Sequence, residues 1–393
     1  MILPEIGGNQ MSGNFCKSIA NAISGKNVVI YGAVSMGARI LNIVDALGEK
    51  TLFFLDRDPD KQKNGFCGYE VKAPENILYE DMANTIVLIS TVVKVRKEIE
   101  ETLVNFGFRE GIEFVYVPTM RYQTCNLIDP LLGYSRSADI NGFKIMGKYD
   151  EKNPNILCLG GSTTDYSFFE IKSWPYFLTE LLKEDNIKLN VLNGGIVSYT
   201  SSQELLKLIR DGLELEPFLV ISYSGANDLV GFPMMGNEYL YRVWRQMESS
   251  MVENDLSSLE TSEHLSVSYG AVSQLEPAEY WYRNEMMMCN ICRGFSIPFI
   301  GILQSGSYIR NANSHSIYEQ RVLNYRTNRE YIEQQFKRAK QLVNASNEQN
   351  ILDFTALFDK CQNVFADDFH VFEQGNEIIA ESIYKILKEK KLL

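Results

Sequence analysis

The stretch Asn155–Asp165, with the sequence NILCLGGSTTD, constrains the fold of this chain more than any other. It opens with a short apolar run bounded by turn formers, which is typical of a strand buried on both faces of a parallel sheet. Two glycines then allow a sharp turn, and Ser162 falls on that turn, directly before a helical pattern. A serine at a strand end, beside a helix amino-terminus, is well placed to be a nucleophile. The alternative is a helix-capping cluster of Ser, Thr and Asp.

Further apolar runs follow, and they alternate with segments of helical period. We expect these runs to form strands at 190–193, 218–223, 298–303 and 350–354. Such alternation predicts a parallel sheet with helices on both faces and with ligand sites at the carboxyl ends of the strands. The sequence therefore predicts an α/β/α domain built on a five-stranded parallel sheet.

The distinctive polar groups of this part of the chain all follow predicted strands. They are Ser162, Gly195, Asn227, Asp367 and His370. A serine nucleophile needs a base within hydrogen-bond reach and a third group that orients the base. His370 and Asp367, three residues apart on one loop, can supply both. The backbone N–H groups of Ser162 and Gly195 and the Asn227 amide are then the candidate oxyanion donors.

The other histidines and the cysteines offer no competing site. His264 and His315 lie in polar segments and are expected on surface loops. Cys289 and Cys292 form a lone CxxC without a second pair or a nearby histidine, so no metal site is predicted. Their spacing places both on one face of a helix, which favours core packing. The seven cysteines show no disulfide framework, which indicates a cytoplasmic protein.

Four motifs, in this order, resemble the SGNH (GDSL-type) hydrolases. They are Gly160-Gly161-Ser162, Gly195, Gly225–Asp228 and Asp367–His370. The resemblance spans about residues 125–393. It implies a flavodoxin-like fold and an activity as an esterase, lipase, carbohydrate deacetylase or acyltransferase. It also implies Ser162 as the nucleophile, with Gly195 and Asn227 as oxyanion donors. His370 and Asp367 take the roles of base and orienting carboxylate.

The chain departs from the pattern of these hydrolases at two places. Gly161 stands where the family usually has Asp before the serine, a variant that is common in its carbohydrate-active branches. A long insertion, rich in large side chains, follows Asn227 at about 229–288. We expect this insertion to form either a lid over the substrate or a contact between copies in a homo-oligomer. Neither departure removes a catalytic group.

A β–turn–α–β pattern spans residues 28–55 near the start of the chain. Its turn carries Gly32 and Gly37, and Asp56 follows its second strand, which is the order of a Rossmann dinucleotide-binding unit. These three are the candidate cofactor-binding residues. Val34 replaces the middle glycine, however, and its side chain is expected to crowd a dinucleotide. Glycines at such a turn also serve helix–strand packing, so the fold is better supported than NAD binding.

The segment from Gly32 to Pro74 resembles the small Rossmann-like domain of sugar-modifying enzymes in bacterial surface-polysaccharide pathways. This resemblance covers roughly residues 25–117. Because some of those domains hold a nucleotide-sugar, it implies a nucleotide or nucleotide-sugar as the ligand. No cofactor is expected for the acyl chemistry itself. We therefore expect a Rossmann-like domain at 1–120, a connector at 121–154 that packs on the second domain, and the hydrolase domain at 155–393.

Composition excludes several classes of partner. A net charge of −12 without a long basic patch argues against nucleic acid. No apolar run approaches the roughly 18 residues that a membrane-spanning helix needs, and no secretory signal is expected at the amino-terminus.

Two hypotheses of different classes follow. The first is a serine-dependent esterase or acyltransferase that acts on an O-acyl, in particular O-acetyl, group of a sugar or glycoconjugate through an acyl-serine. The second is a nucleotide or nucleotide-sugar binding protein, or an oxidoreductase, whose second domain is an idle SGNH-like scaffold. The complete set of serine, glycine, asparagine and histidine residues favours the first.

Overall fold

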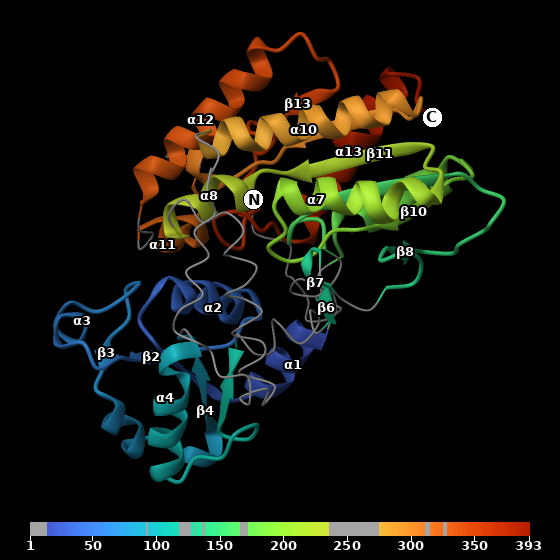
Figure 1. Ribbon diagram of the computed structural model, residues 1–393. Coiled ribbons are helices and arrows are strands. Elements are labelled where there is room, and N and C mark those ends of the chain that lie inside the picture. The colour runs from blue at the N-terminus through green and yellow to red at the C-terminus, as the bar shows by residue number, and fades with distance from the viewer. Residues whose placement is uncertain are drawn as a thin grey trace.

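The computed structural model describes residues 14–91, 93–117, 127–129, 131–135, 138–165, 172–235, 275–310, 315–324 and 328–393. Two open sheets dominate these ranges, one in the blue part of the chain and one in the green-to-red part (Figure 1). No helix in the described ranges is long and apolar enough to cross a membrane.

The first sheet has five strands, all parallel, in the order β3-β2-β1-β4-β5. Its elements are α1 (Asn14–Ile23), β1 (Asn27–Tyr31), α2 (Ser35–Ala46), β2 (Thr51–Leu55), α3 (Pro59–Asn64), β3 (Val71–Lys72), η1 (Pro74–Tyr79), η2 (Met82–Asn84), β4 (Thr85–Ile89), α4 (Val93–Asn105) and β5 (Phe114–Tyr116). Val28 and Ile30 pack toward α1 and α2, whereas Val29 and Tyr31 pack toward α4. The alternation of side chains along a strand thus buries both faces of β1.

The second sheet has the order β13-β12-β11-β9-β10-β8. Its elements are β8 (Lys144–Met146), β9 (Asn155–Gly160), α6 (Trp174–Glu184), β10 (Asn190–Asn193), α7 (Ser201–Lys207), the π-helical turn η4 (Leu208–Gly212), η5 (Leu213–Leu215), β11 (Leu219–Ser224), α8 (Ala226–Met235), α10 (Pro277–Gly294), β12 (Phe299–Leu303), η6 (Ser307–Ile309), α11 (Ile317–Asn324), α12 (Arg329–Ala345), β13 (Ile351–Asp353) and α13 (Glu373–Glu389). Five of the strands are parallel and follow the flavodoxin-like order, so the predicted α/β fold class is confirmed.

Strand β9 lies inside this sheet and is buried on both faces. Ile156 and Cys158 contact the layer that contains α6 and α13, whereas Leu157 and Leu159 contact the layer that contains α10. Each large apolar side chain buried in this way contributes roughly 1.5–3 kcal/mol. This two-sided burial explains why the run that precedes Ser162 is continuously apolar.

The predicted five-stranded sheet is wrong in one respect, because a sixth strand comes from the connector. Strand β8 pairs antiparallel with β10 at the edge of the second sheet. Phe143, just before β8, is fully buried and lies so close to Gly194 that a Cβ there would be 2.5 Å from its ring. The connector also contains the hairpin of β6 (Leu127–Asp129) and β7 (Gly133–Ser135). Segments this short give no strand period in the sequence.

The predicted insertion at 229–288 is too wide at both ends. Helix α8 runs to Met235, and α10 begins at Pro277 and packs against β12, α7 and α12. Trp281, one of the aromatic residues of the predicted insertion, is fully buried in the core and donates a hydrogen bond from Nε1 to Ser224 Oγ. Residues 236–274, where the lid or oligomer contact was predicted, lie outside the described residues.

Two buried glutamates face each other behind β11. Ser222 Oγ lies 3.0 Å from Glu204 Oε2 and 2.9 Å from Glu285 Oε1. One hydroxyl carries a single proton, so it can donate to only one of these carboxyl groups, and a protonated carboxyl must donate to it in return. Burial, with the Asp228 carboxylate nearby, raises the pKa of Glu285 to about 8. Burial and the neighbouring carboxylates also raise the pKa of Glu204.

Candidate active site

The turn after β9 places Ser162 at the carboxyl edge of the second sheet. A Cβ at Gly160 would lie 2.1 Å from Thr164 Oγ1 and 2.6 Å from the Tyr223 carbonyl oxygen, so only glycine fits there. The N–H groups of Thr164 and Asp165 donate to the Gly161 carbonyl and close the turn. The continuation at 166–171, where a helix was expected, lies outside the described residues.

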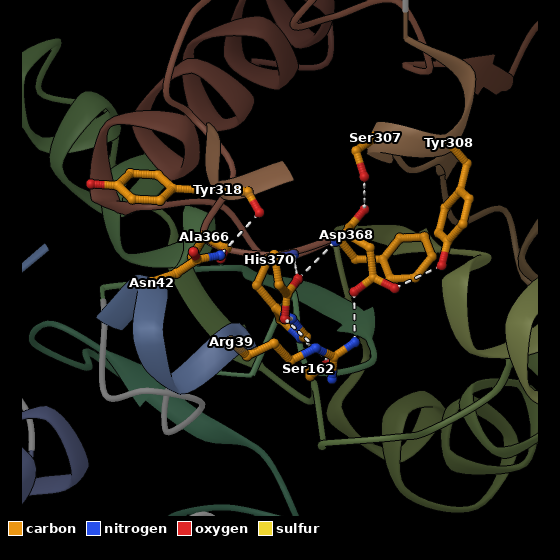
Figure 2. A network of polar contacts seen from close by, with 11 residues as sticks. Arg39, Asn42, Ser162, Ser307, Tyr308, Tyr318, Ala366, Asp368 and His370 are labelled. Atoms are coloured by element: carbon orange, nitrogen blue, oxygen red, sulfur yellow. Dashed lines mark hydrogen bonds and ion pairs between the residues drawn. The ribbon is translucent and has the colours of Figure 1, made fainter. Parts of the chain in front are cut away.

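Ser162, His370 and Asp367 form a hydrogen-bonded chain. Ser162 Oγ lies 2.7 Å from His370 Nε2, and His370 Nδ1 lies 2.7 Å from Asp367 Oδ2 (Figure 2). The backbone N–H groups of Phe369 and His370 both donate to Asp367 Oδ1 at 2.8 Å. The loop that carries the imidazole therefore also holds the carboxylate that orients it. This geometry matches the requirements of a serine nucleophile with its base.

The Asp367 carboxyl stays ionised although it is buried. Burial alone would raise its pKa, but the adjacent His370 imidazole, the Arg39 guanidinium and the hydrogen bonds to His370 together hold that pKa well below its usual value. A carboxylate in this state can accept a hydrogen bond from Nδ1–H, and Nε2, which faces Ser162, is then the nitrogen that can take the serine proton.

The predicted oxyanion donors lie near Ser162 but are not all equally placed. The Ser162 N–H donates to no acceptor within the described ranges. Asn227 Nδ2 donates to the Tyr199 carbonyl at 2.8 Å, and it lies 2.4 Å from the point where a Cβ on Gly161 would be. The Gly195 N–H, by contrast, donates to Asn193 Oδ1 at 2.9 Å. The Gly195 N–H and the Asn227 amide thus each already donate to a group of the protein, whereas the Ser162 N–H does not within the described ranges.

A steric contact explains why position 161 is a glycine in this structure. The Asn227 amide occupies the space that the side chain of any other residue at this position would need. The glycine before the serine thus goes together with the close approach of Asn227 to the turn.

Two residues of the site, Asn193 and Arg39, were not predicted from the sequence. Asn193 bridges the site by donating from Nδ2 to the Thr164 carbonyl and accepting from the Gly195 N–H. Arg39 reaches the Asp367 loop from α2 of the first sheet. The available signal for Arg39 was its place in a helix whose other side chains are mostly apolar, with the polar Asn42 three positions later.

A cavity opens beside Ser162 and His370. Its lining includes Thr163, Ser173, Asn376 and Ile379. Asn376 Oδ1 is buried and has no hydrogen-bond partner among the described residues. The space next to the nucleophile therefore combines polar side chains with the apolar side chains of Phe369, Val371 and Ile379.

Of the other two histidines, His315 lies within the described residues and His264 does not. His315 is partly exposed, and its Nε2 lies 2.8 Å from the Ser307 carbonyl oxygen, beside the loop of His370 rather than at Ser162. His264 lies outside the described residues. Cys289 and Cys292 are both buried against the second sheet.

The candidate cofactor-binding residues serve the turn before α2. A Cβ at Gly37 would lie 2.2 Å from the Gly32 carbonyl oxygen, and one at Gly32 would lie 2.7 Å from Ser90 Oγ. Asp56 Oδ2 accepts from the Ala33 N–H at 3.0 Å and from Lys61 at 2.9 Å. Both glycines are thus required by packing, and the Asp56 carboxylate is engaged within its own domain.

Of the comparisons with known proteins, only the one with solved structures found similar proteins. No protein-family model matches the chain, and no curated protein matches it. An acetyl xylan esterase aligns over 59% of this chain and 99% of its own, with 13% identity and a TM-score of 0.40. A GDSL-like lipase from Bacteroides thetaiotaomicron aligns over 62% and 92%, with 16% identity and a TM-score of 0.36. An acetylxylan esterase from Geobacillus stearothermophilus aligns over 60% and 95%, with 16% identity and a TM-score of 0.36.

Proposed function

We propose that this protein is a serine-dependent esterase or acyltransferase that works through an acyl-serine on Ser162. The observation that carries the proposal is the chain of two 2.7 Å contacts from Ser162 Oγ through the His370 imidazole to Asp367. A serine that only capped a turn would have no need of an imidazole whose other nitrogen is held by a buried carboxylate.

The reaction follows from these contacts. As Ser162 Oγ attacks the ester carbonyl carbon, its proton passes to His370 Nε2. The bond from that carbon to the alcohol oxygen then breaks, and the alcohol leaves with the proton from His370. Water or a second hydroxyl attacks the acyl-serine in the same way, gives its proton to His370, and releases Ser162, which takes that proton back.

The negative oxygen formed in each attack needs donors that are fixed beforehand. The Ser162 N–H and the Asn227 amide are the groups that we assign to this role. A single donor of this kind typically contributes about 2.7–4 kcal/mol of barrier lowering.

The cavity lining favours a short acyl group. A long alkyl chain would bury the unpartnered Asn376 oxygen against hydrocarbon, which is costly for a polar group without a partner. An acetyl group avoids this burial. The proposal that the acyl carrier is a sugar or glycoconjugate rests on the resemblance of the first domain to those of sugar-modifying enzymes.

The test is the intact mass of the protein after incubation with an activated acetyl ester. We expect the wild type to gain one acetyl group and to turn the ester over, whereas Ser162→Ala does neither and stays folded. Ser382→Ala is the matched control, because among the described residues its hydroxyl donates to the Ile378 carbonyl of its own helix, α13. Undiminished turnover in Ser162→Ala would overturn the proposal and favour the idle-scaffold alternative.

For the first domain we propose a positioning role, with at most weak binding of a nucleotide or nucleotide-sugar. The Asp56 carboxylate is engaged in its own turn, and Val34 stands exposed where a dinucleotide would approach. Calorimetry of the full chain with NAD is expected to show no tight binding, and a tight complex would contradict this role.

A further inference from the structure

Helix α2 of the first sheet contacts the loop that carries His370. Arg39 Nη2 lies 2.7 Å from Asp368 Oδ1, and Arg39 Nε lies 3.5 Å from Asp367 Oδ2 (Figure 2). The Arg39 side chain is only 12% exposed. A residue more than 300 positions away in the sequence thus touches the carboxylate that orients the base.

A second side chain of α2 holds the same loop by its backbone. Asn42 Nδ2 donates to the Ala366 carbonyl at 2.9 Å and to the Tyr318 carbonyl at 3.0 Å. Asp45, one turn further along α2, pairs with Arg321 on α11. One face of α2 is therefore fixed to α11 and to the start of the His370 loop.

The loop needs a cation for electrostatic reasons. Asp367 and Asp368 are adjacent, and both side chains are almost completely buried. Two buried carboxylates side by side repel each other unless a positive charge compensates them. Burial would lower the pKa of Arg39, but Asp368 and Asp367 together raise it, so the guanidinium remains charged.

Asp368 is held firmly enough to transmit this contact. Its Oδ2 accepts a hydrogen bond from the Tyr308 hydroxyl at 2.9 Å. Its carbonyl oxygen accepts from the Ser307 N–H at 3.0 Å and from Ser307 Oγ at 3.1 Å. Arg39 therefore bridges a fixed carboxylate and the catalytic one.

We propose that Arg39 is a positioning residue of the active site, which holds Asp367 in line with His370 and compensates the charge of Asp368. The first domain then supplies part of the active site of the second. This inference rests on the function proposed above.

The net charge beside His370 determines how the reactivity of Ser162 depends on pH, which can be measured. Arg39, Asp367 and Asp368 carry one net negative charge, and loss of Arg39 leaves two beside His370. Added negative charge stabilises the His370 imidazolium. The pH below which His370 is protonated, and can no longer accept the Ser162 proton, therefore rises by about 1 pH unit or more. Loss of alignment at Asp367 lowers the maximal rate as well, by up to about 100-fold.

Other titratable groups surround His370 and stay the same in the variants below. They are Asp165 and Tyr223 in the cavity, Tyr308 and His315 beside the loop, and Glu373 at the start of α13. A difference in pH profile between variants therefore results from the changed charges at Arg39 and Asp368.

The experiment measures how fast a fluorophosphonate labels Ser162 between pH 5 and pH 9 in the full chain, followed by intact mass. This probe needs only an activated serine, so it does not depend on knowing the substrate. We expect Arg39→Met to label more slowly at every pH, with the acid limb moved to higher pH. Arg39→Met/Asp368→Asn restores the net charge, so its acid limb returns to the wild-type position while its maximal rate stays about tenfold low.

Asp45→Asn is the matched control, because it removes another ion pair of α2, the one with Arg321 on α11, without touching the Asp367–His370 loop. We expect it to label at the wild-type rate. Equal slowing in Asp45→Asn, or wild-type labelling in folded Arg39→Met, would overturn the inference. If Arg39→Met does not fold, the double variant decides, since labelling at the wild-type rate there excludes a positioning role. A wild type that does not label would instead contradict the proposed function.

Discussion

Changing Glu285 to Gln should alter how the stability of the protein depends on pH. In the wild type the pair of Glu285 and Glu204 shares the Ser222 hydroxyl, which requires a protonated carboxyl in the folded state. An amide in place of the Glu285 carboxyl keeps an acceptor for Ser222 and Ser224 and removes the titrating group. We expect Glu285→Gln to be as stable as the wild type or more stable at pH 8.

The sign follows from the proton that the folded state retains. The pKa of Glu285 is raised from 4.5 in a model peptide to about 8 in the folded protein. Between these two values the folded state binds more protons than the unfolded state, so the free energy of unfolding decreases as pH rises. The contribution is fully present below pH 4.5 and is lost as pH rises through about 8.

The size of the effect follows from the same two pKa values. A displacement from 4.5 to about 8 corresponds to roughly 5 kcal/mol, which is an upper bound because the buried pair can rearrange. Even half of that would be a large part of the roughly 5–15 kcal/mol by which domains are stable.

Urea unfolding at several pH values between 5 and 8.5 provides the assay. Trp281 is a useful fluorescent reporter, because its indole N–H bonds to Ser224, which also contacts Glu285. The exposed Glu330→Gln is the matched control and should keep the pH dependence of the wild type. Parallel curves for the wild type and Glu285→Gln would refute the shared-proton interpretation.

Three further predictions concern the proposed catalytic residues. Asp367→Asn should lower kcat on a short acyl ester by about 10⁴-fold, and Asp367→Asn combined with His370→Ala should cost little more than His370→Ala alone, because the two residues act as one unit; additive losses in a kinetic double-mutant cycle would contradict this. His315→Ala should leave the rate near normal, so an equally damaged His315→Ala in the same assay would show that the base is wrongly assigned. Gly161→Ala should displace Asn227, which loses its hydrogen bond to the Tyr199 carbonyl, and lower kcat by roughly 10²–10³-fold with only a small decrease in melting temperature. Full activity in this variant would remove Asn227 from the oxyanion site.

Much of the fold was predictable because buried parallel strands leave a strong signal. Runs such as 156–159 are continuously apolar, and the polar residues after them must meet at one sheet edge. That rule predicted that Ser162 and the Asp367–His370 loop lie close together, and in the structure Ser162 Oγ contacts His370 Nε2. The same rule gives no rank among oxyanion donors, since the hydrogen bond from Gly195 to Asn193 depends on local geometry.

The remaining features depend on contacts that no local pattern encodes. Strand β8 is three residues long, and its partner β10 lies more than 40 residues later. Arg39 lies on a helix beside one sheet and contacts a loop beside the other, and a helical period shows only that it is polar. The width of the predicted insertion was wrong because aromatic residues at the start of α10 serve the core, as Trp281 shows.

The pairing of β8 with β10 limits how this chain can be divided. A fragment that began at residue 150 would contain the serine and its base, but it would lose the strand that covers the edge of β10. It would also lose Phe143, and with it the ring beneath the buried Lys207 ammonium, whose Nζ lies 4.6 Å from the ring centroid. An uncovered strand edge favours pairing between chains and aggregation. Modular exchange of the second domain must therefore include the connector, so a recombination point that preserves it lies before residue 121 rather than at the start of β9.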